Sequence, residues 1–280
     1  MLAAVQNFIP VVTTEAGLCL TAENWKEAKV NAVSYSIESL LHKPGIALLN
    51  SLPDLAHYLG WSGSIILNAS MLVANKEGIY TLRSPYDGSK LKLTVIEVID
   101  LLLHLKPNAV ILPKNCAQDY PLIWDNWVDS ITPFLSVSDL QRQNVPRAHG
   151  VYFNYTNEST LDELDKWSHL PRYVAGDFEP ELIQRLRVKE IEFIETDEPA
   201  KAAINGRVYS RSGMVDLTDG ITRMQFEVID PECACPVCAQ QFTKAYFHHL
   251  LQHTPLLCQR LLIQHNVFWM AESGKLVKNS

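Results

Sequence analysis

The chain has 280 residues, of which 47% are hydrophobic and 20% are charged, so it has ample material for a folded core and is not an intrinsically disordered chain. Its 31 acidic and 24 basic side chains give a net charge of −7, which counts against strong nucleic-acid binding unless a local basic patch supplies it. The longest apolar runs, such as Leu101–Leu105, are far too short to span a bilayer, so no membrane partner is expected.

Short β-rich apolar runs alternate with helical patterns along most of the chain. Eight runs predict strands, at Phe8–Thr13, Ala32–Ser39, Ser64–Ser70, Ala109–Asn115, Ile131–Ser138, Gly150–Thr156, Arg172–Asp177 and Ile191–Asp197. Helical patterns between several of them cover Ala22–Lys29, Leu93–Leu105, Thr160–Trp167 and Pro180–Val188. This alternation predicts an α/β fold with a parallel sheet, and eight parallel strands favour a closed (β/α)8 barrel.

A cluster of cysteines follows the last predicted strand. Cys233, Cys235 and Cys238 fall within six residues, and His265 ends a helical run downstream. Three thiolates and one imidazole complete a tetrahedral Zn²⁺ site with no position left for water, so the site is predicted to be structural. We expect residues 1–229 to form the barrel and residues 230–280 a zinc-binding segment packed on it. Zinc thiolates without a disulfide pattern predict a cytoplasmic protein.

The same residues carry a family resemblance. The strings DPECACPVC, AYFHHLL and HN between Asp230 and Asn266 resemble the zinc-binding segment of the tRNA-guanine transglycosylases, also called queuine tRNA-ribosyltransferases. The gap between Cys238 and His265 is about one residue longer than in the family. Further matches are Lys43-Pro44-Gly45, the RSPYDGSK hairpin at Arg83–Lys90, Pro171-Arg172-Tyr173, Asn205-Gly206 and Ser212-Gly213. The resemblance implies a zinc-bearing barrel that exchanges guanine in a tRNA anticodon for a deazaguanine base.

Several residues at the positions of the family's reactive groups differ from the family pattern. The family has Thr-Asp-Ser-Gly-Gly and then an aromatic after the third strand, whereas Asn68 stands at the proton-handling aspartate and Leu72 at the aromatic. An amide cannot act as a general base. Lys114 takes the place of the base-reading carboxylate, and Tyr152 and Phe153 occupy the expected glycine pair. These two rings are expected to fill the base pocket.

The nucleophile position keeps a carboxylate but lengthens it. Pro199 and Asn205-Gly206 fix the register, so Glu195 replaces the family's aspartate nucleophile. Carboxylates can attack sugars, but the extra methylene displaces the oxygens in a site built for attack geometry. Of the two anticodon-binding arginines that the resemblance implies, one becomes Lys201 and the other Ile204. Lysine can hold a phosphate only as a point charge, and isoleucine cannot hold one.

The charge distribution also departs from what a tRNA-binding site needs. Residues 157–198 hold twelve acids against five bases. Part of this acid is expected on solvated helix faces, but Glu195, Asp197 and Glu198 lie at a strand end where tRNA phosphates would approach. Phosphate binding depends on neutralisation by Lys and Arg, so this strand end is poorly suited to it.

Three functions remain open at this point. The first is an accessory protein with a degenerate base-exchange site, acting as a homodimer or as a heterodimer with a catalytic transglycosylase subunit. The family's zinc segment contributes to dimer contacts, and in eukaryotes the active enzyme pairs with a non-catalytic paralogue that this chain resembles. The second is an active base-exchange enzyme that uses Glu195, with Asp197 as the nearest replacement proton carrier. The third is a free-standing base- or RNA-binding protein.

Overall fold

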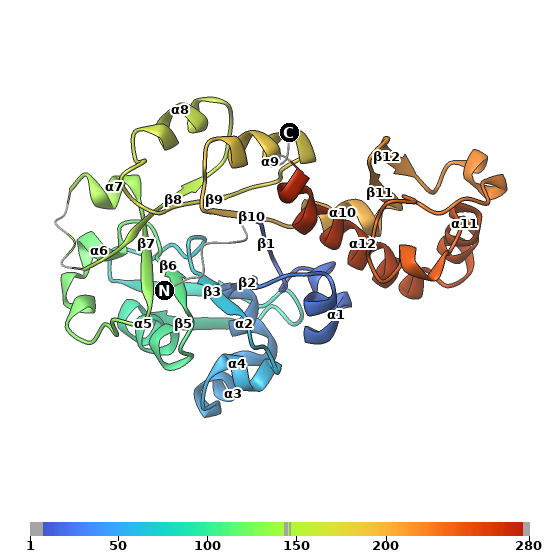
Figure 1. Ribbon diagram of the computed structural model, residues 1–280. Helices are drawn as coiled ribbons and strands as arrows, with labels where there is room; N and C mark the ends of the chain where they lie inside the picture. Colours follow the sequence, from blue (N-terminus) through green and yellow to red (C-terminus); the bar gives the residue numbers. More distant parts are fainter. Residues whose placement is uncertain (1–7, 143–144, 146, 277–280) are drawn as a thin grey trace.

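A barrel of eight parallel strands forms the body of the molecule in the computed structural model, which describes residues 8–142, 145 and 147–276 (Figure 1). The strands are β1 (Phe8–Pro10), β2 (Ala32–Ser36), β3 (Ser64–Asn68), β6 (Ala109–Ile111), β7 (Thr132–Ser136), β8 (Gly150–Asn154), β9 (Arg172–Ala175) and β10 (Phe193–Thr196). Each of the eight predicted runs contains one of them, so the predicted α/β barrel is confirmed.

The strands pair in the order β1-β10-β9-β8-β7-β6-β3-β2, all in parallel. The two ends of this sheet meet at one parallel bridge between Val11 and Ser34, where the Val12 amide donates to the Ser34 carbonyl at 3.0 Å. The barrel is therefore nearly closed, and within the described residues one bridge and a hydrogen bond from the Ser36 amide to the Thr13 hydroxyl join its two ends.

Helices cover the outside of the barrel and form most of the carboxyl-terminal lobe. They are α1 (Ala22–Glu27), α2 (Ile37–Leu40), α3 (Ile46–Ser51), α4 (Leu55–Leu59), α5 (Val95–His104), α6 (Cys116–Asp119), α7 (Val137–Leu140), α8 (Ser159–Asp165), α9 (Pro180–Val188), α10 (Glu198–Ile204), α11 (Lys244–His253) and α12 (Pro255–Leu276). Among these described helices none is both long and apolar enough to cross a membrane.

Local capping explains where predicted elements begin and end. Strand β2 stops at Ser36, short of the predicted Ser39, because the Ser36 hydroxyl accepts from the Ser39 amide and starts α2. Helix α5 starts at Val95 because Thr94 and Glu97 form a capping box, so the first two residues of the predicted helix end strand β5 (Lys90–Thr94) instead.

Side chains alternate across the barrel wall. Residues that point inward, such as Ile66, Phe134 and Tyr173, form one apolar cluster inside the barrel. Their neighbours along each strand, such as Ile65 and Leu135, belong to a second and larger cluster between the sheet and the helices. The barrel interior is therefore packed, and chemistry is confined to the carboxyl ends of the strands.

Two antiparallel hairpins extend from the barrel. The hairpin β4 (Ile79–Arg83)–β5 (Lys90–Thr94) lies between β3 and α5, where the resemblance implied a hairpin. The hairpin β11 (Arg207–Ser210)–β12 (Gly213–Asp216) lies beside α11 and α12 in the lobe on the right of Figure 1. This hairpin precedes residue 229, where the sequence predicts the boundary between the barrel and the zinc-binding segment. That boundary stays a prediction. Residues 1–7 and 277–280 of the two predicted segments lie outside the described part of the chain.

Candidate functional site

The predicted metal ligands converge at one point. Cys233 and Cys235 lie in the loop after Asp230, Cys238 begins a short helical turn, and His265 lies on α12. Their ligand atoms all lie within 4.8 Å of one another. His265 Nδ1 is 3.9, 3.3 and 3.4 Å from the sulfurs of Cys233, Cys235 and Cys238. Bonds of about 2.3 Å to sulfur and about 2.0 Å to nitrogen give a tetrahedral edge of about 3.5 Å, so the set fits Zn²⁺.

The surroundings of the ligands fix the histidine tautomer. His265 Nε2 lies 2.8 Å from the carbonyl oxygen of Tyr209, so it donates its hydrogen there and leaves the Nδ1 lone pair facing the sulfurs. Asn266 bonds the Tyr209 amide at 3.0 Å and the carbonyls of Arg207 and Pro199 at 2.9 and 3.0 Å. The four ligands therefore form a structural zinc site that joins the loop at 233–238 to α12, and the hydrogen bonds of His265 and Asn266 join α12 to β11. Sequence reasoning identified the ligands but not the roles of Tyr209 and Asn266.

A second group of interacting polar residues lies at the barrel mouth, which is the opening formed by the carboxyl ends of the strands. Glu195 is only 6% exposed, and both of its carboxylate oxygens accept hydrogen bonds. Asn68 Nδ2 donates to Oε1 at 2.8 Å, and the Tyr173 hydroxyl donates to Oε2 at 2.6 Å. Burial raises the pKa of Glu195, while these hydrogen bonds oppose the rise. The two positions that the sequence assigned to nucleophile and proton transfer thus bind each other.

The hydrogen-bonded network continues across the mouth to β8. Ser70 donates to Asn68 Oδ1 at 2.7 Å, and its hydroxyl lies 3.2 Å from that of Tyr152. Tyr152 packs with the cluster inside the barrel, where its ring centroid is 6.1 Å from that of Tyr173. Phe153, the next residue, points outward into the layer between sheet and helices. The expectation that both rings fill the pocket is therefore wrong for Phe153, because consecutive strand residues face opposite sides.

The two lysines at predicted substrate-binding positions are on the surface. Lys114 is exposed after β6 and takes part in no ion pair among the described residues. Lys201 lies on α10, where its ammonium group is 2.6 Å from Asp177. Lys201 is therefore already neutralised by a carboxylate, which weakens it as a phosphate contact. Neither lysine contributes to the mouth network.

The acids at the end of β10 differ from the predicted exposed cluster. Asp197 is 6% exposed, and among the described residues neither of its oxygens has a hydrogen-bond partner. The neighbouring Thr14 hydroxyl donates instead to the Val11 carbonyl at 3.3 Å. Burial raises the pKa of Asp197 to about 6. Glu198 is partly buried and lies 3.7 Å from Arg207. The turn from β10 into α10 therefore buries Asp197 and partly buries Glu198, which the sequence alone did not reveal.

Comparisons with known proteins point to the same family as the motifs of the zinc-binding segment. The sequence model of the family described as queuine tRNA-ribosyltransferase matches residues 154–280. A queuine tRNA-ribosyltransferase of Thermotoga maritima is 23% identical to this chain, over 98% of this chain and 86% of the relative. Proteins of the same name from Natranaerobius thermophilus and Halothermothrix orenii are 24% and 22% identical, over 97% and 94% of this chain and 85% and 83% of their own lengths.

Proposed function

Because this chain is a divergent member of the queuine tRNA-ribosyltransferase family, we propose that it acts as a non-catalytic, accessory subunit in tRNA base exchange of the queuosine type. One observation supports this most directly. The carboxylate at the nucleophile position is buried and accepts hydrogen bonds from Asn68 and Tyr173, at 2.8 and 2.6 Å. A nucleophile needs a free lone pair aimed at its target, and Glu195 has neither oxygen free of a protein donor.

The remaining parts of the mouth support the same proposal. Asn68 offers an amide where the family needs a proton-handling carboxylate, and its oxygen is held by Ser70. Each hydrogen bond to a charged group is worth about 1.5–3 kcal/mol, so freeing Glu195 for attack would cost several kcal/mol. Tyr152 adjoins this network, with its ring packed against the cluster inside the barrel and its hydroxyl 3.2 Å from that of Ser70. The network stabilises the barrel rather than a transition state.

The zinc lobe offers a surface for a partner subunit. Apolar side chains of α11 and α12 divide between two environments: Phe247, Leu250 and Leu262 pack on the chain itself, whereas Tyr246 and Leu256 are 41% and 79% exposed. The exposed members suit association with a second copy or with a catalytic transglycosylase, in the cytoplasm where reduced thiolates persist. tRNA would reach this chain as part of such a complex.

Base-exchange assays test the accessory role. Exchange of labelled guanine into tRNA is measured with the chain alone, with a catalytic transglycosylase alone and with both. We expect no turnover by the chain alone, co-purification with the catalytic subunit, and the same result for Glu195→Gln. Turnover by the chain alone that disappears in Glu195→Gln would contradict the proposal. A monodisperse monomer that neither binds the enzyme nor alters its turnover would also contradict it.

A second candidate function rests on Asp197. Its buried carboxylate, which has no hydrogen-bond partner among the described residues, has a pKa of about 6, which is suited to exchanging protons near neutral pH. In this alternative Glu195 attacks the ribose carbon and Asp197 carries the proton that the family's missing aspartate would carry. Guanine exchange that is lost in both Glu195→Gln and Asp197→Asn, with both variants folded, would establish it. Exchange unchanged in Asp197→Asn would exclude this role.

A further inference from the structure

The β4–β5 hairpin places like charges directly opposite each other. Arg83 of β4 pairs in register with Lys90 of β5, and Lys92 lies two residues further along the same exposed face. The other face carries Tyr80, Leu82 and Leu93, which are buried. Like charges directly across an antiparallel pair destabilise it, so this arrangement needs a reason outside the hairpin itself.

These three cations have no acidic partners within the described part of the chain. No ion pair among the described residues includes a residue of β4 or β5. By contrast, Lys201 and Lys189 each pair with an aspartate at 2.6 Å. The chain has a net charge of −7, so acidic side chains outnumber basic ones. A basic face that they do not neutralise is complementary to a polyanion.

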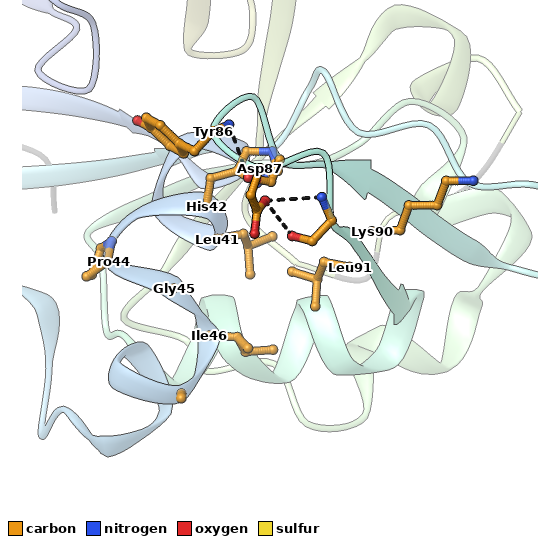
Figure 2. A pocket seen from close by; sticks show the side chains of 12 residues that line it. Leu41, His42, Pro44, Gly45, Ile46, Tyr86, Asp87, Lys90 and Leu91 are labelled. Atoms are coloured by element: carbon orange, nitrogen blue, oxygen red, sulfur yellow. Dashed lines mark hydrogen bonds between the residues drawn. The ribbon is translucent and has the colours of Figure 1, made fainter.

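A cleft adjoins this basic face. It has a volume of about 520 Å³ and lies between the hairpin and the segment that joins α2 to α3. Figure 2 shows Leu41, Leu91 and Ile46 beneath Asp87, whose Oδ1 accepts from the Ser89 amide at 3.1 Å and the Ser89 hydroxyl at 2.8 Å. The cleft thus combines an apolar floor with a hydrogen-bond acceptor, and Lys90 belongs to both the cleft and the basic face.

An exposed aromatic ring stands at the edge of the cleft. Tyr86 is 70% exposed, and Lys43 Nζ lies 5.5 Å from its ring centroid. Proteins hold single-stranded nucleic acid with cations placed along its phosphate backbone and with apolar or aromatic surfaces that contact its bases. The hairpin, the cleft and Tyr86 together supply these features. The hairpin follows the carboxyl end of β3, so it stands on the same side of the barrel as the mouth.

We propose that the basic face of the β4–β5 hairpin and the adjoining cleft bind single-stranded RNA, with phosphates on Arg83, Lys90 and Lys92 and an unpaired base in the cleft. The proposal deepens the proposed function and rests on it only for the choice of RNA among polyanions. It gives the chain an RNA contact where the end of β10 offers none, because Ile204 carries no charge and Lys201 is already paired.

Binding of a short single-stranded oligoribonucleotide to the isolated full chain tests the phosphate contacts. The triple variant Arg83→Gln/Lys90→Gln/Lys92→Gln is expected to bind about tenfold more weakly or worse near neutral pH and low salt. The slope of log affinity against log salt should become shallower by about 2, since about 0.7 of a counterion is released per single-strand phosphate. The matched control Lys106→Gln/Lys166→Gln removes exposed lysines elsewhere and should bind as the parent does.

Thermal unfolding of the triple variant distinguishes weaker binding from loss of the fold. Removing like charges from opposite strands should leave the thermal midpoint unchanged or slightly raised, so weaker binding by the triple variant would not reflect unfolding. Parent chain that binds no RNA, or a triple variant that binds as tightly as the parent, would overturn the proposal. So would a triple variant that loses co-purification with a catalytic transglycosylase while retaining RNA binding, since the hairpin would then be a protein interface.

Inorganic polyphosphate separates the base contact from the charge contacts. Ala47 lines the cleft on α3 and is exposed, so Ala47→Trp fills the cleft without disturbing the hairpin. This variant should weaken RNA binding several-fold and leave polyphosphate binding unchanged. Equal effects on both ligands, or on neither, would overturn the placement of a base in the cleft. If the chain does not associate with a transglycosylase, the accessory role is contradicted but the RNA-binding measurements still stand. Failure of the proposed function and failure of the RNA site can therefore be distinguished.

Discussion

Replacing Asp197 by asparagine should stabilise the protein at neutral pH. The carboxylate of Asp197 is 6% exposed and has no hydrogen-bond donor among the described residues. Burying an ionised carboxylate without a partner costs free energy, and the neutral amide of asparagine avoids that cost while keeping the shape. The variant therefore isolates the charge from the packing.

The size of the effect follows from the shift in pKa. The pKa of Asp197 rises from 3.8 to about 6 on folding, and each unit is worth about 1.4 kcal/mol, so the ionised form costs about 3 kcal/mol. The folded state holds the proton more tightly than the unfolded state, so the contribution of this group is fully present below about pH 4 and is lost as the pH rises through about 6. The asparagine amide is also unpartnered, which reduces the expected gain to about 1–3 kcal/mol.

Denaturant unfolding at several pH values measures this gain. The free energy of unfolding of Asp197→Asn should exceed that of the parent above about pH 6, and the two should converge near about pH 4. Asp125→Asn, at an exposed aspartate, is the matched control and should change little at either pH. A variant that is destabilised equally at all pH values would refute the reasoning, because the effect would then not depend on the charge of the carboxylate. A variant destabilised mainly above about pH 4 would also refute it, because it would mean that the carboxylate has a partner.

Three further predictions concern the mouth and the zinc site. Tyr173→Phe removes the donor at 2.6 Å from Glu195 and should lower the free energy of unfolding by about 1.5–3 kcal/mol, measured by denaturant unfolding; a change below about 0.5 kcal/mol would contradict it. Asn68→Asp places a second carboxylate beside Glu195 and should destabilise the fold near pH 7 more than near pH 5, whereas the reverse order would exclude charge repulsion. Cys235→Ser should release zinc and melt the carboxyl-terminal lobe, seen as lost metal content and an early thermal transition; an unchanged melting profile would contradict a structural zinc.

The fold could be predicted from the sequence because its signals are local and repeated. Eight apolar runs separated by helical patterns identify a parallel barrel without knowledge of any contact, and each run contains a strand of the sheet. Strand ends were less predictable, because they depend on caps such as Ser36 and Thr94, which compete with the strand for the same backbone groups. The hairpin at 79–94 came from the family resemblance and not from periodicity.

The zinc ligands could be predicted for a similar reason. Cysteine spacing is a property of sequence, and the metal itself draws the ligands together. What lies around them could not be predicted in the same way. The contacts from His265 and Asn266 to Tyr209 span 56 and 57 positions, and they depend on how α12 packs against β11.

At the barrel mouth, matching positions to the family pattern was not enough to predict how the side chains lie. Alignment placed Tyr152 and Phe153 together at a glycine pair, but the pleat of β8 sends one ring into the barrel and the other out of it. Alignment also gave Glu195 as an altered nucleophile, without showing that Asn68, the second altered position, binds it at 2.8 Å. The two substitutions therefore act as one pair and cannot be judged separately.

That pairing also explains how the buried carboxylate is accommodated in a stable fold. A buried carboxylate left without donors would be costly, and an amide at position 68 supplies the donor that an aspartate there could not. Asp197, two residues after Glu195, received no such donor and remains unpartnered among the described residues. The stability and activity of Asp197→Asn are therefore the measurements that best separate an accessory subunit from an altered enzyme.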